Sequence, residues 1–399
     1  MKTTLTLLLA LASFCMQSQT LTWVDQLGGT LENVVNTMAT DASGNVYTAG
    51  RFEGTMDADP GPGTLILTSV GGLDMFVTEV NSSGSLVWAR QINGLNSSVY
   101  GDELFSIAVG ASGSVYLTGR FSGTVDFDPG SGIFNLITLP SSEFCNPHKD
   151  IFILKLNPSG DFVWAEQVGG NGYDKVYAIA LGSNESVHIL GAYATLSGEP
   201  VDMDPGPGTY FLDSSFGASD FVLKLNADGT FVWAGLFSSN GGGGGQCGVR
   251  STDIYPSSIS VDGSDNLYVT GRLNGSADAD PGPGTYTLAA VGGSNGFVFK
   301  WNSSGNFVWA RQLTGAYCNV NDAAIDASGN VYTTGFFTGT VDFDPGTVTR
   351  NLKAPGSPGT SEIFVWKLNS SGNYMWAGQM GGNGTEEGSA IDLDGNNNI

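Results

Sequence analysis

Pairs of aspartates recur along the chain and are the residues best suited to chemistry. Each pair belongs to the motif D-x-D-P-G, in which two carboxylates precede a Pro-Gly turn. The pairs are Asp57 and Asp59, Asp126 and Asp128, Asp202 and Asp204, Asp278 and Asp280, and Asp342 and Asp344. A further acid follows four of the five pairs, at Asp74, Asp150, Asp220 and Glu362. Hard cations prefer carboxylate and carbonyl oxygens, so three acids in one loop predict a Ca²⁺ site.

A turn without metal is the alternative interpretation of the same motif. An aspartate before a Pro-Gly turn accepts hydrogen bonds from nearby backbone amides, and Pro and Gly fix the turn by themselves. The motif also lacks the D-x-D-x-D-G ligand spacing of an EF-hand loop. Both interpretations stay open at this point, and a bound Ca²⁺ would order the loops rather than catalyse a reaction.

The elements that must position these acids are set by an internal repeat of about 71 residues. Segments such as SLVWARQ and NFVWARQ place tryptophans in register, at Trp88, Trp164, Trp233, Trp309 and Trp376, and LTWVDQL adds Trp23. A VYxTG series begins at Val46, Val115, Val187, Leu267 and Val331. An FVxKLN series begins at Asp74, Asp150, Asp220, Gly296 and Glu362. Alternation with period two in these segments indicates short, half-buried strands.

Four short strands in each repeat predict an all-β protein, a β-propeller of four-stranded antiparallel blades. Residues 21–399 would form a single propeller domain of five full repeats and a truncated sixth. The segment IDLDGNNNI is typical of the first strand of that sixth blade, and LTWVDQL is a lone fourth strand. The fourth strand would close the ring by completing the last blade, so we expect six or seven blades in the complete protein.

The repeat resembles a known family. The runs D-x-F-V-x-K-L-N, S-G-x-x-V-W-A and S-G-N-V-Y-x-T-G are similar to the bacterial SBBP-type β-propeller repeat, over nearly all of residues 21–395. The D-x-D-P-G insertions also resemble those of surface proteins exported through a type IX system. This resemblance implies a propeller fold and a secreted bacterial protein, and it implies no particular ligand.

The N-terminus and the net charge indicate the compartment. Residues 1–20 combine Lys2, an apolar run from Leu5 to Phe14 and a polar stretch, which is typical of a secretory signal peptide. Cys15 suggests a lipoprotein, but Phe14 stands where a small residue is needed. No apolar segment has the length of a membrane span. The net charge of -23 would repel nucleic acids and anionic membranes.

Other reactive residues give few signals. Cys145, Cys247 and Cys318 remain after the leader, and either Cys247 and Cys318 form a disulfide or the thiols are isolated. His148 lies in an insertion, whereas His188 occupies a tyrosine position of the repeat and is expected in the core. We expect the repeated tryptophans to pack, and Lys155, Lys224, Lys300 and Lys367 to pair with carboxylates. Motifs of serine hydrolases, zinc proteases and phosphate-binding loops are absent from the sequence.

Two insertions break the repeat and direct the functional interpretation. One spans residues 140–149, and the other contains Gly241 to Gly245 and Arg250. Strand order predicts that both lie on the face of the D-x-D-P-G loops, where a rigid scaffold usually binds its ligand. We therefore expect an extracellular or cell-surface binding and adhesion module for a glycan or a surface protein. The alternatives are a polysaccharide-acting enzyme, either a glycosidase or a lyase, and a purely structural surface spacer. The oligomeric state stays open.

Overall fold

The computed structural model describes residues 23–24, 26–94, 102–138, 149–170, 172, 174–195, 200–212, 217–239, 253–355 and 359–399. The predicted signal peptide and both insertion loops, apart from Lys149, lie outside these residues. All regular elements in the described ranges are β-strands, and no helix there is long and apolar enough to cross a membrane.

Five units of four antiparallel strands follow one another along the chain, one for each repeat. Three of them are separate sheets, and the first and third units also pair with short outer strands of the next blade. The first blade contains β2 (Asn33–Thr40), β3 (Val46–Asp57), β4 (Ile66–Val80) and β5 (Leu86–Gly94). The second contains β6 (Glu103–Val109), β7 (Val115–Phe121), β10 (Asp150–Leu156) and β11 (Phe162–Val168). The third contains β12 (Lys175–Leu181), β13 (Val187–Thr195), β16 (Gly217–Leu225) and β17 (Phe231–Ser239).

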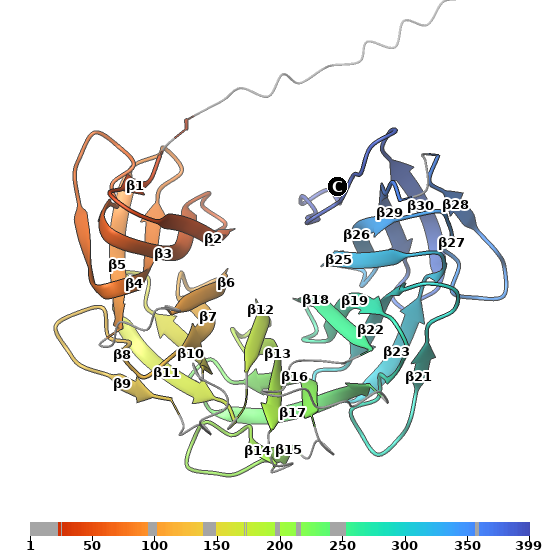
Figure 1. Ribbon diagram of the computed structural model, residues 1–399, viewed down its shortest axis with the longest axis horizontal. Helices are drawn as coiled ribbons and strands as arrows, with labels where there is room; N and C mark the ends of the chain where they lie inside the picture. The colour runs from red at the N-terminus through yellow and green to blue at the C-terminus, as the bar shows by residue number, and fades with distance from the viewer. Residues whose placement is uncertain are drawn as a thin grey trace, which may run out of the picture.

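The last two blades have the same order of strands. The fourth blade contains β18 (Ile254–Val261), β19 (Leu267–Leu273), β22 (Asn295–Trp301) and β23 (Phe307–Gln312). The fifth contains β25 (Cys318–Ile325), β26 (Val331–Phe337), β29 (Glu362–Leu368) and β30 (Tyr374–Met380). Figure 1 shows the five blades around a common centre, with the first strand of each blade innermost and the ring open between the first and fifth blades. The predicted propeller of four-stranded blades is confirmed.

Turn chemistry explains why each repeat forms hairpins. In the first turn of the first blade, the Asp41 carboxylate accepts hydrogen bonds from the backbone amides of Ser43 and Asn45, at 2.8 and 2.9 Å. Gly44 has a positive φ of 78°, which a glycine adopts at no steric cost. Asp262 and Asp326 form the same turn in the fourth and fifth blades. An aspartate and a glycine at fixed spacing therefore close this turn in the first and fifth blades, whereas the fourth blade has Asp265, with a φ of 65°, at the glycine position.

The hydrophobic core lies between neighbouring sheets. One cluster joins the first and second blades, and equivalent clusters join the later pairs. Tyr47 and Trp88 pack with ring centroids 6.2 Å apart, and Tyr268 and Trp309 repeat this contact at 6.0 Å. The predicted packing is confirmed for Trp88, Trp164, Trp233 and Trp309, whereas Trp376 is exposed.

Ten short strands form a second layer of pairing at the outer ends of the blades. They are β1 (Gly28–Gly29), β8 (Thr124–Asp126), β9 (Asn135–Ile137), β14 (Val201–Asp202), β15 (Phe211–Leu212), β20 (Ser276–Asp278), β21 (Thr287–Ala289), β24 (Thr314–Gly315), β27 (Thr340–Asp342) and β28 (Asn351–Lys353). The segment between the second and third strands is therefore a β-hairpin. Its first strand pairs with the end of the preceding fourth strand, as in β5 with β8 and β17 with β20.

Candidate ligand-binding site

Each D-x-D-P-G motif lies at the tip of one of these outer hairpins. In the second blade, Asp126 ends β8 and pairs with Asn93 of the first blade. The Asp126 Oδ1 atom accepts the backbone amides of Asp128 and Phe134, at 3.1 and 2.8 Å. The Asp128 Oδ1 atom accepts the amide of Gly130 at 2.8 Å. Two nested turns built on side-chain acceptors therefore close the hairpin.

All five motifs have this arrangement. The first aspartates accept two amides each, at Asp57, Asp202, Asp278 and Asp342. The second aspartates accept one amide each, at Asp59, Asp204, Asp280 and Asp344. The hydrogen bonds of the metal-free interpretation are thus all present.

The third acid of the predicted site is buried at the start of the third strand. Asp74 is 1 % exposed, and its Oδ2 atom accepts the Val70 amide at 2.9 Å and the Gln91 side-chain amide at 2.7 Å. Burial raises the pKa of Asp74 above its ordinary value. Asp150 and Glu362 are buried at the equivalent positions, whereas in the third blade Ser219 occupies this position and the buried Asp220 lies one residue later.

The fourth blade shows what this position requires. Asn295 stands where the first, second and fifth blades have an acid, and its Oδ1 atom accepts the Val291 amide at 2.7 Å. A neutral amide therefore caps the same loop without a negative charge. In the described part of the chain, no three His, Cys, Asp or Glu side chains gather as a metal site would require. Calcium at these motifs stays a prediction.

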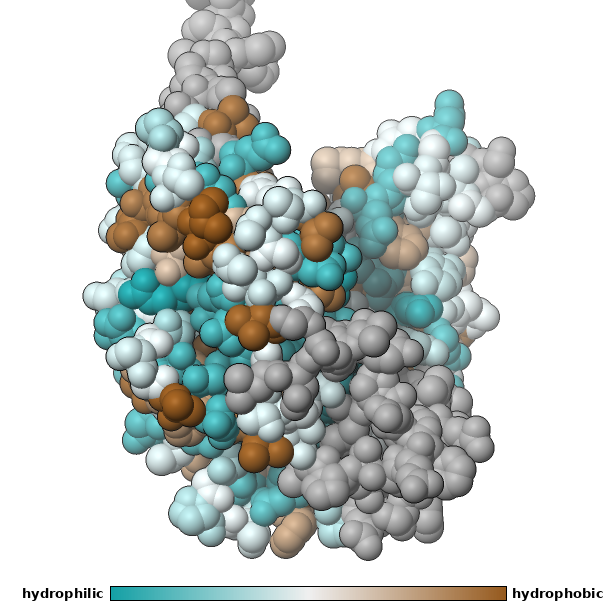
Figure 2. Space-filling view, turned by 60° about the vertical axis from the view of Figure 1, so that its left-hand side comes forward, coloured by the Kyte–Doolittle hydropathy of each residue, from teal (hydrophilic) through white to brown (hydrophobic). Residues whose placement is uncertain are grey.

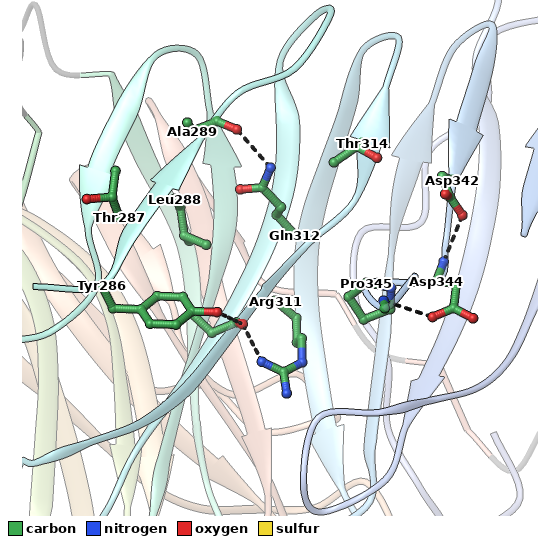
Figure 3. Close-up of a pocket in the computed structure, with 12 residues that line it drawn as sticks. Tyr286, Thr287, Leu288, Ala289, Arg311, Gln312, Thr314, Asp342, Asp344 and Pro345 are labelled. Atoms are coloured by element: carbon green, nitrogen blue, oxygen red, sulfur yellow. Dashed lines mark hydrogen bonds between the residues drawn. The ribbon is translucent and has the colours of Figure 1, made fainter. Parts of the chain in front are cut away.

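A pocket of about 360 Å³ lies between the outer hairpins of the fourth and fifth blades. Figure 3 shows its two walls, with Tyr286 and Arg311 on one side and Asp342 and Asp344 on the other. The strands that position these residues are β21, β23, β24 and β27 with the turn that follows it. The pocket thus includes the fifth D-x-D-P-G motif and joins two blades.

Local contacts hold the pocket side chains in place. The Tyr286 ring packs on Phe307 with centroids 4.7 Å apart, and its hydroxyl donates to the Ala310 carbonyl at 3.4 Å. The Arg311 Nε atom donates to the Gly372 carbonyl at 2.7 Å. Gln312 donates through Nε2 to the Ala289 carbonyl at 2.8 Å. The Oε1 atom of Gln312 is buried and accepts no hydrogen bond.

This pocket departs from the repeat at two positions. We call the contact between two neighbouring blades a junction and number the junctions along the chain, so this pocket lies at the fourth. Tyr286 and Arg311 correspond to Leu65 and Arg90 at the first junction, and to Phe134 and Glu166 at the second. At the third junction the equivalent residues are Tyr210 and Gly235. Among these four junctions, a tyrosine and an arginine meet at the last alone. The sequence analysis missed this combination, although a comparison of the repeats position by position contains the signal.

At the second junction an acid, Glu166, stands at the position of Arg311. Burial raises the pKa of Glu166 to about 7, and the negative charge of Asp204 raises it further. Arg311 replaces this glutamate at the pocket beside the equivalent Asp344. The fourth junction therefore has the cation Arg311 beside its D-x-D-P-G motif, whereas the second junction has the acid Glu166 at the same position.

The other sequence predictions have mixed outcomes. His188 is 0 % exposed and packs edge-on against Trp233, which confirms its core position. Lys155, Lys224 and Lys300 face carboxylates as predicted, whereas Lys367 donates to the Tyr332 hydroxyl. Cys318 is a free and buried thiol, so the disulfide alternative is wrong for it. Cys145, Cys247, His148, Gly241 to Gly245 and Arg250 lie outside the described residues.

Two comparisons with known proteins agree with this architecture. Residues 246–276 match the model of the family SBBP, described as a beta-propeller repeat. The chain is also 23% identical to an uncharacterized WD repeat-containing protein, L264, of Acanthamoeba polyphaga mimivirus, over 94% of this chain. The match covers 30% of that relative's length, so the chain is similar to a part of it. Its five blades make the chain a β-propeller, and the SBBP match over residues 246–276 agrees with this fold.

Proposed function

We propose that this propeller is an extracellular carbohydrate-binding module, and that the pocket between its fourth and fifth blades holds the glycan. The observation that carries the proposal is the pocket lining, in which Tyr286 and Arg311 face Asp342 and Asp344 across one hollow between two blades.

The remaining pocket chemistry supports a ligand rich in hydroxyl groups. The Tyr286 side chain is amphipathic, with an apolar ring face and a polar tip, and such a ring suits the mixed surface of a sugar. Asp344 and Arg311 supply acceptors and donors on opposite walls. The volume of about 360 Å³ lies at the lower end of the range for small-molecule sites, roughly 300–1,000 Å³. The net charge of -23 favours neutral glycans over polyanions.

A glycan array followed by calorimetric titration tests this proposal. We expect a neutral glycan to bind, and Tyr286→Ala to weaken binding by roughly tenfold or more, about 1.4 kcal/mol. Tyr210→Ala is the matched control, because the Tyr210 ring packs on Phe231 in the same way, at 4.9 Å, beside Gly235 rather than an arginine. Equal losses in the two variants, or no binding by the unmodified protein, would overturn the proposal. The second result would favour a surface spacer.

The same glycans test the enzymatic alternative. A glycosidase would release reducing ends from a bound polysaccharide, and a lyase would create unsaturated products. We expect neither product after prolonged incubation, because the carboxylates of Asp342 and Asp344 are both engaged in backbone turns. Product formation that Asp344→Asn abolishes would establish the enzyme instead.

A further inference from the structure

An arginine recurs near the end of the second strand of a blade. It is Arg51 in the first blade, Arg120 in the second and Arg272 in the fourth. Arg51 pairs with Glu32 at 2.8 Å and with Glu103 at 3.6 Å. Arg120 also pairs with Glu103. In the first two of these blades, therefore, a carboxylate neutralises the arginine.

The fourth blade has a tyrosine in place of the carboxylate. Tyr255 is the cross-strand partner of Arg272, and the same position of the second blade is Glu103. Within the described residues Arg272 forms no ion pair, and its Nη1 atom donates one hydrogen bond, to the Tyr317 hydroxyl at 2.9 Å. Because a guanidinium has five N–H donors, most of the hydrogen-bonding capacity of Arg272 is unused.

Aromatic rings hold this guanidinium in place. Its central carbon lies 4.2 Å from the ring centroid of Tyr255 and 5.6 Å from that of Tyr317. Tyr317 in turn stacks on Phe336, with ring centroids 5.7 Å apart and the planes inclined by 27°. Such contacts fix the position of a cation without neutralising its charge. All four side chains are half-buried, so each is still partly accessible to solvent.

Arg272, Tyr255, Tyr317 and Phe336 together form what we call the inner site. Tyr255 belongs to β18 and Tyr317 directly precedes β25, and these two first strands contact each other near the centre of the ring (Figure 1). The inner site shares no residue with the pocket between the outer hairpins. It is therefore separate from the proposed glycan pocket, and neither depends on the other.

We propose that the inner site binds a sugar that carries a single carboxylate group, as a uronic acid does. The ligand carboxylate takes the place that Glu103 has beside Arg120, and it accepts hydrogen bonds from the unused N–H groups of Arg272. The Tyr317 hydroxyl accepts a hydrogen bond from Arg272, so its own proton is available to the same carboxylate. Pairs of arginine with a carboxylate are among the strongest hydrogen-bonded contacts in proteins.

The surroundings of Arg272 favour a sugar with one charge. The rings of Tyr255 and Tyr317 combine apolar faces with polar tips, which suit the mixed surface of a sugar. The chain has 38 acidic residues against 15 basic ones, and hydrophilic residues are spread over the described surface in Figure 2. This charge repels a ligand with several carboxylates, whereas Arg272 neutralises a single one.

Titrations with two matched sugars test the proposal. Methyl β-glucuronide carries the carboxylate, and methyl β-glucoside has a neutral hydroxymethyl group in its place. By ligand-observed NMR and calorimetry, we expect the glucuronide to bind roughly tenfold or more tightly than the glucoside. Arg272→Gln should abolish this preference, whereas Arg120→Gln, at the same position of the second blade, should leave it unchanged. Equal binding of the two sugars, no binding of the glucuronide, or equal losses in the two variants would overturn the proposal.

A second variant tests the site without removal of the arginine. Tyr255→Glu restores the carboxylate that the second blade has at Glu103, so Arg272 gains a partner within the protein. We expect the glucuronide to bind roughly tenfold or more weakly to this variant. The unfolding midpoint should not fall, which would exclude misfolding as the cause. Undiminished binding by Tyr255→Glu would contradict the proposed place of the ligand carboxylate.

A peptide probe distinguishes the sugar from an acidic protein segment. Acetyl-glutamate amide presents one carboxylate on a peptide unit and has no sugar ring. We expect the glucuronide to bind more tightly than this amide, because the rings of Tyr255 and Tyr317 flank the guanidinium. Tighter binding of the amide would assign the inner site to an acidic peptide and would overturn the proposal.

Discussion

The Glu185 carboxylate accepts a hydrogen bond from the hydroxyl of Tyr116, in the preceding blade, at 2.9 Å. The same carboxylate accepts the Ser112 amide at 2.7 Å. Glu185 has a positive φ of 56°, in a turn position that is a glycine in the first two blades. Burial raises the pKa of Glu185, but the hydrogen bonds from Ser112 and Tyr116 outweigh burial and hold it below the ordinary value. A strained backbone is thus retained where a side chain bridges two blades.

Replacement of Glu185 separates the strain from the bridge. Glu185→Ala removes both hydrogen bonds and keeps the left-handed strain, so we expect a loss of about 1–3 kcal/mol of unfolding free energy. Glu185→Gly also removes the hydrogen bonds but relieves the strain, and it should be more stable than the alanine variant by about 1 kcal/mol. Urea unfolding measures both values. Alanine and glycine variants of equal stability would show that the backbone at this turn is not strained.

Asp102 predicts an unusual dependence of stability on pH. Burial raises its pKa to about 7, although the Ser122 amide and Lys149 oppose the shift, and Asp74 and Glu103 add to it. The folded state therefore holds the proton more tightly than the unfolded chain, with its ordinary pKa of about 3.9. The destabilising contribution is complete above pH 7 and disappears as the pH falls toward 4.

Asp102→Asn should remove this contribution while it keeps the acceptor for the Ser122 amide, 3.1 Å away. We expect the variant to exceed the unmodified protein by roughly 2–4 kcal/mol at pH 8, and the difference to vanish near pH 4. Urea unfolding from pH 4.5 to 8.5 measures the difference at each pH. The exposed Asp392, changed to Asn, is the control and should change stability by less than about 0.5 kcal/mol. A pH-independent difference for Asp102→Asn would contradict the prediction.

The two interpretations of the D-x-D-P-G motif differ in what an asparagine does. Asp126 uses one oxygen for two backbone amides, so Asp126→Asn should keep the turn and Asp126→Ala should lose about 1–2 kcal/mol. A Ca²⁺ ligand would behave differently, because the neutral amide would weaken binding nearly as much as alanine. Thermal unfolding in EDTA and then in millimolar Ca²⁺ distinguishes them. A calcium-selective rise of the midpoint that Asp126→Asn removes would establish a metal site.

The repeat made the four-stranded blades predictable from the sequence, whereas the short strands of the outer hairpins could not be predicted. Tryptophans in register and the VYxTG series indicate four strands in each blade, because period and turn residues are local properties of the sequence. The segment after the D-x-D-P-G motif has no alternation strong enough to indicate a strand. The strands on either side of the motif, β8 and β9, are three residues long, and they form because β8 pairs with β5 of the preceding blade and β9 pairs with β8.

The same distinction applies to the candidate site. The aspartates were found because they recur, and the structure places each of them in a turn. Tyr286 and Arg311 were missed because they do not recur. Their proximity depends on how the fourth blade's hairpin lies beside its own fourth strand and beside Asp344 of the next blade, which is tertiary information.

Cys318 should be inert in the folded protein. Burial raises the pKa of its thiol to about 12, and the Gly296 amide donates to the sulfur at 2.9 Å, which opposes the shift. Since the thiolate is the reactive form, we expect no alkylation of Cys318 by iodoacetamide at pH 8 under native conditions, and rapid alkylation in urea. Peptide mapping by mass spectrometry assigns the modified residue. Alkylation of Cys318 in both conditions at equal rates would contradict its burial.

His188 and Asp102 should change the stability in opposite directions as the pH falls, because burial lowers the pKa of His188 and raises that of Asp102. Burial lowers its pKa to about 4, although the Asp265 carboxylate opposes the shift, and both ring nitrogens are buried without a hydrogen-bond partner. The unfolded chain, with an ordinary pKa of about 6.5, therefore binds the proton first, and stability falls as the pH drops from 6.5 toward 4. His188→Tyr restores the residue of the other blades, and we expect a gain of about 1 kcal/mol at pH 7. The gain should increase at pH 5, because the tyrosine binds no proton there. Urea unfolding at the two values checks this, and a smaller gain at pH 5 than at pH 7 would show that His188 is already protonated in the folded protein.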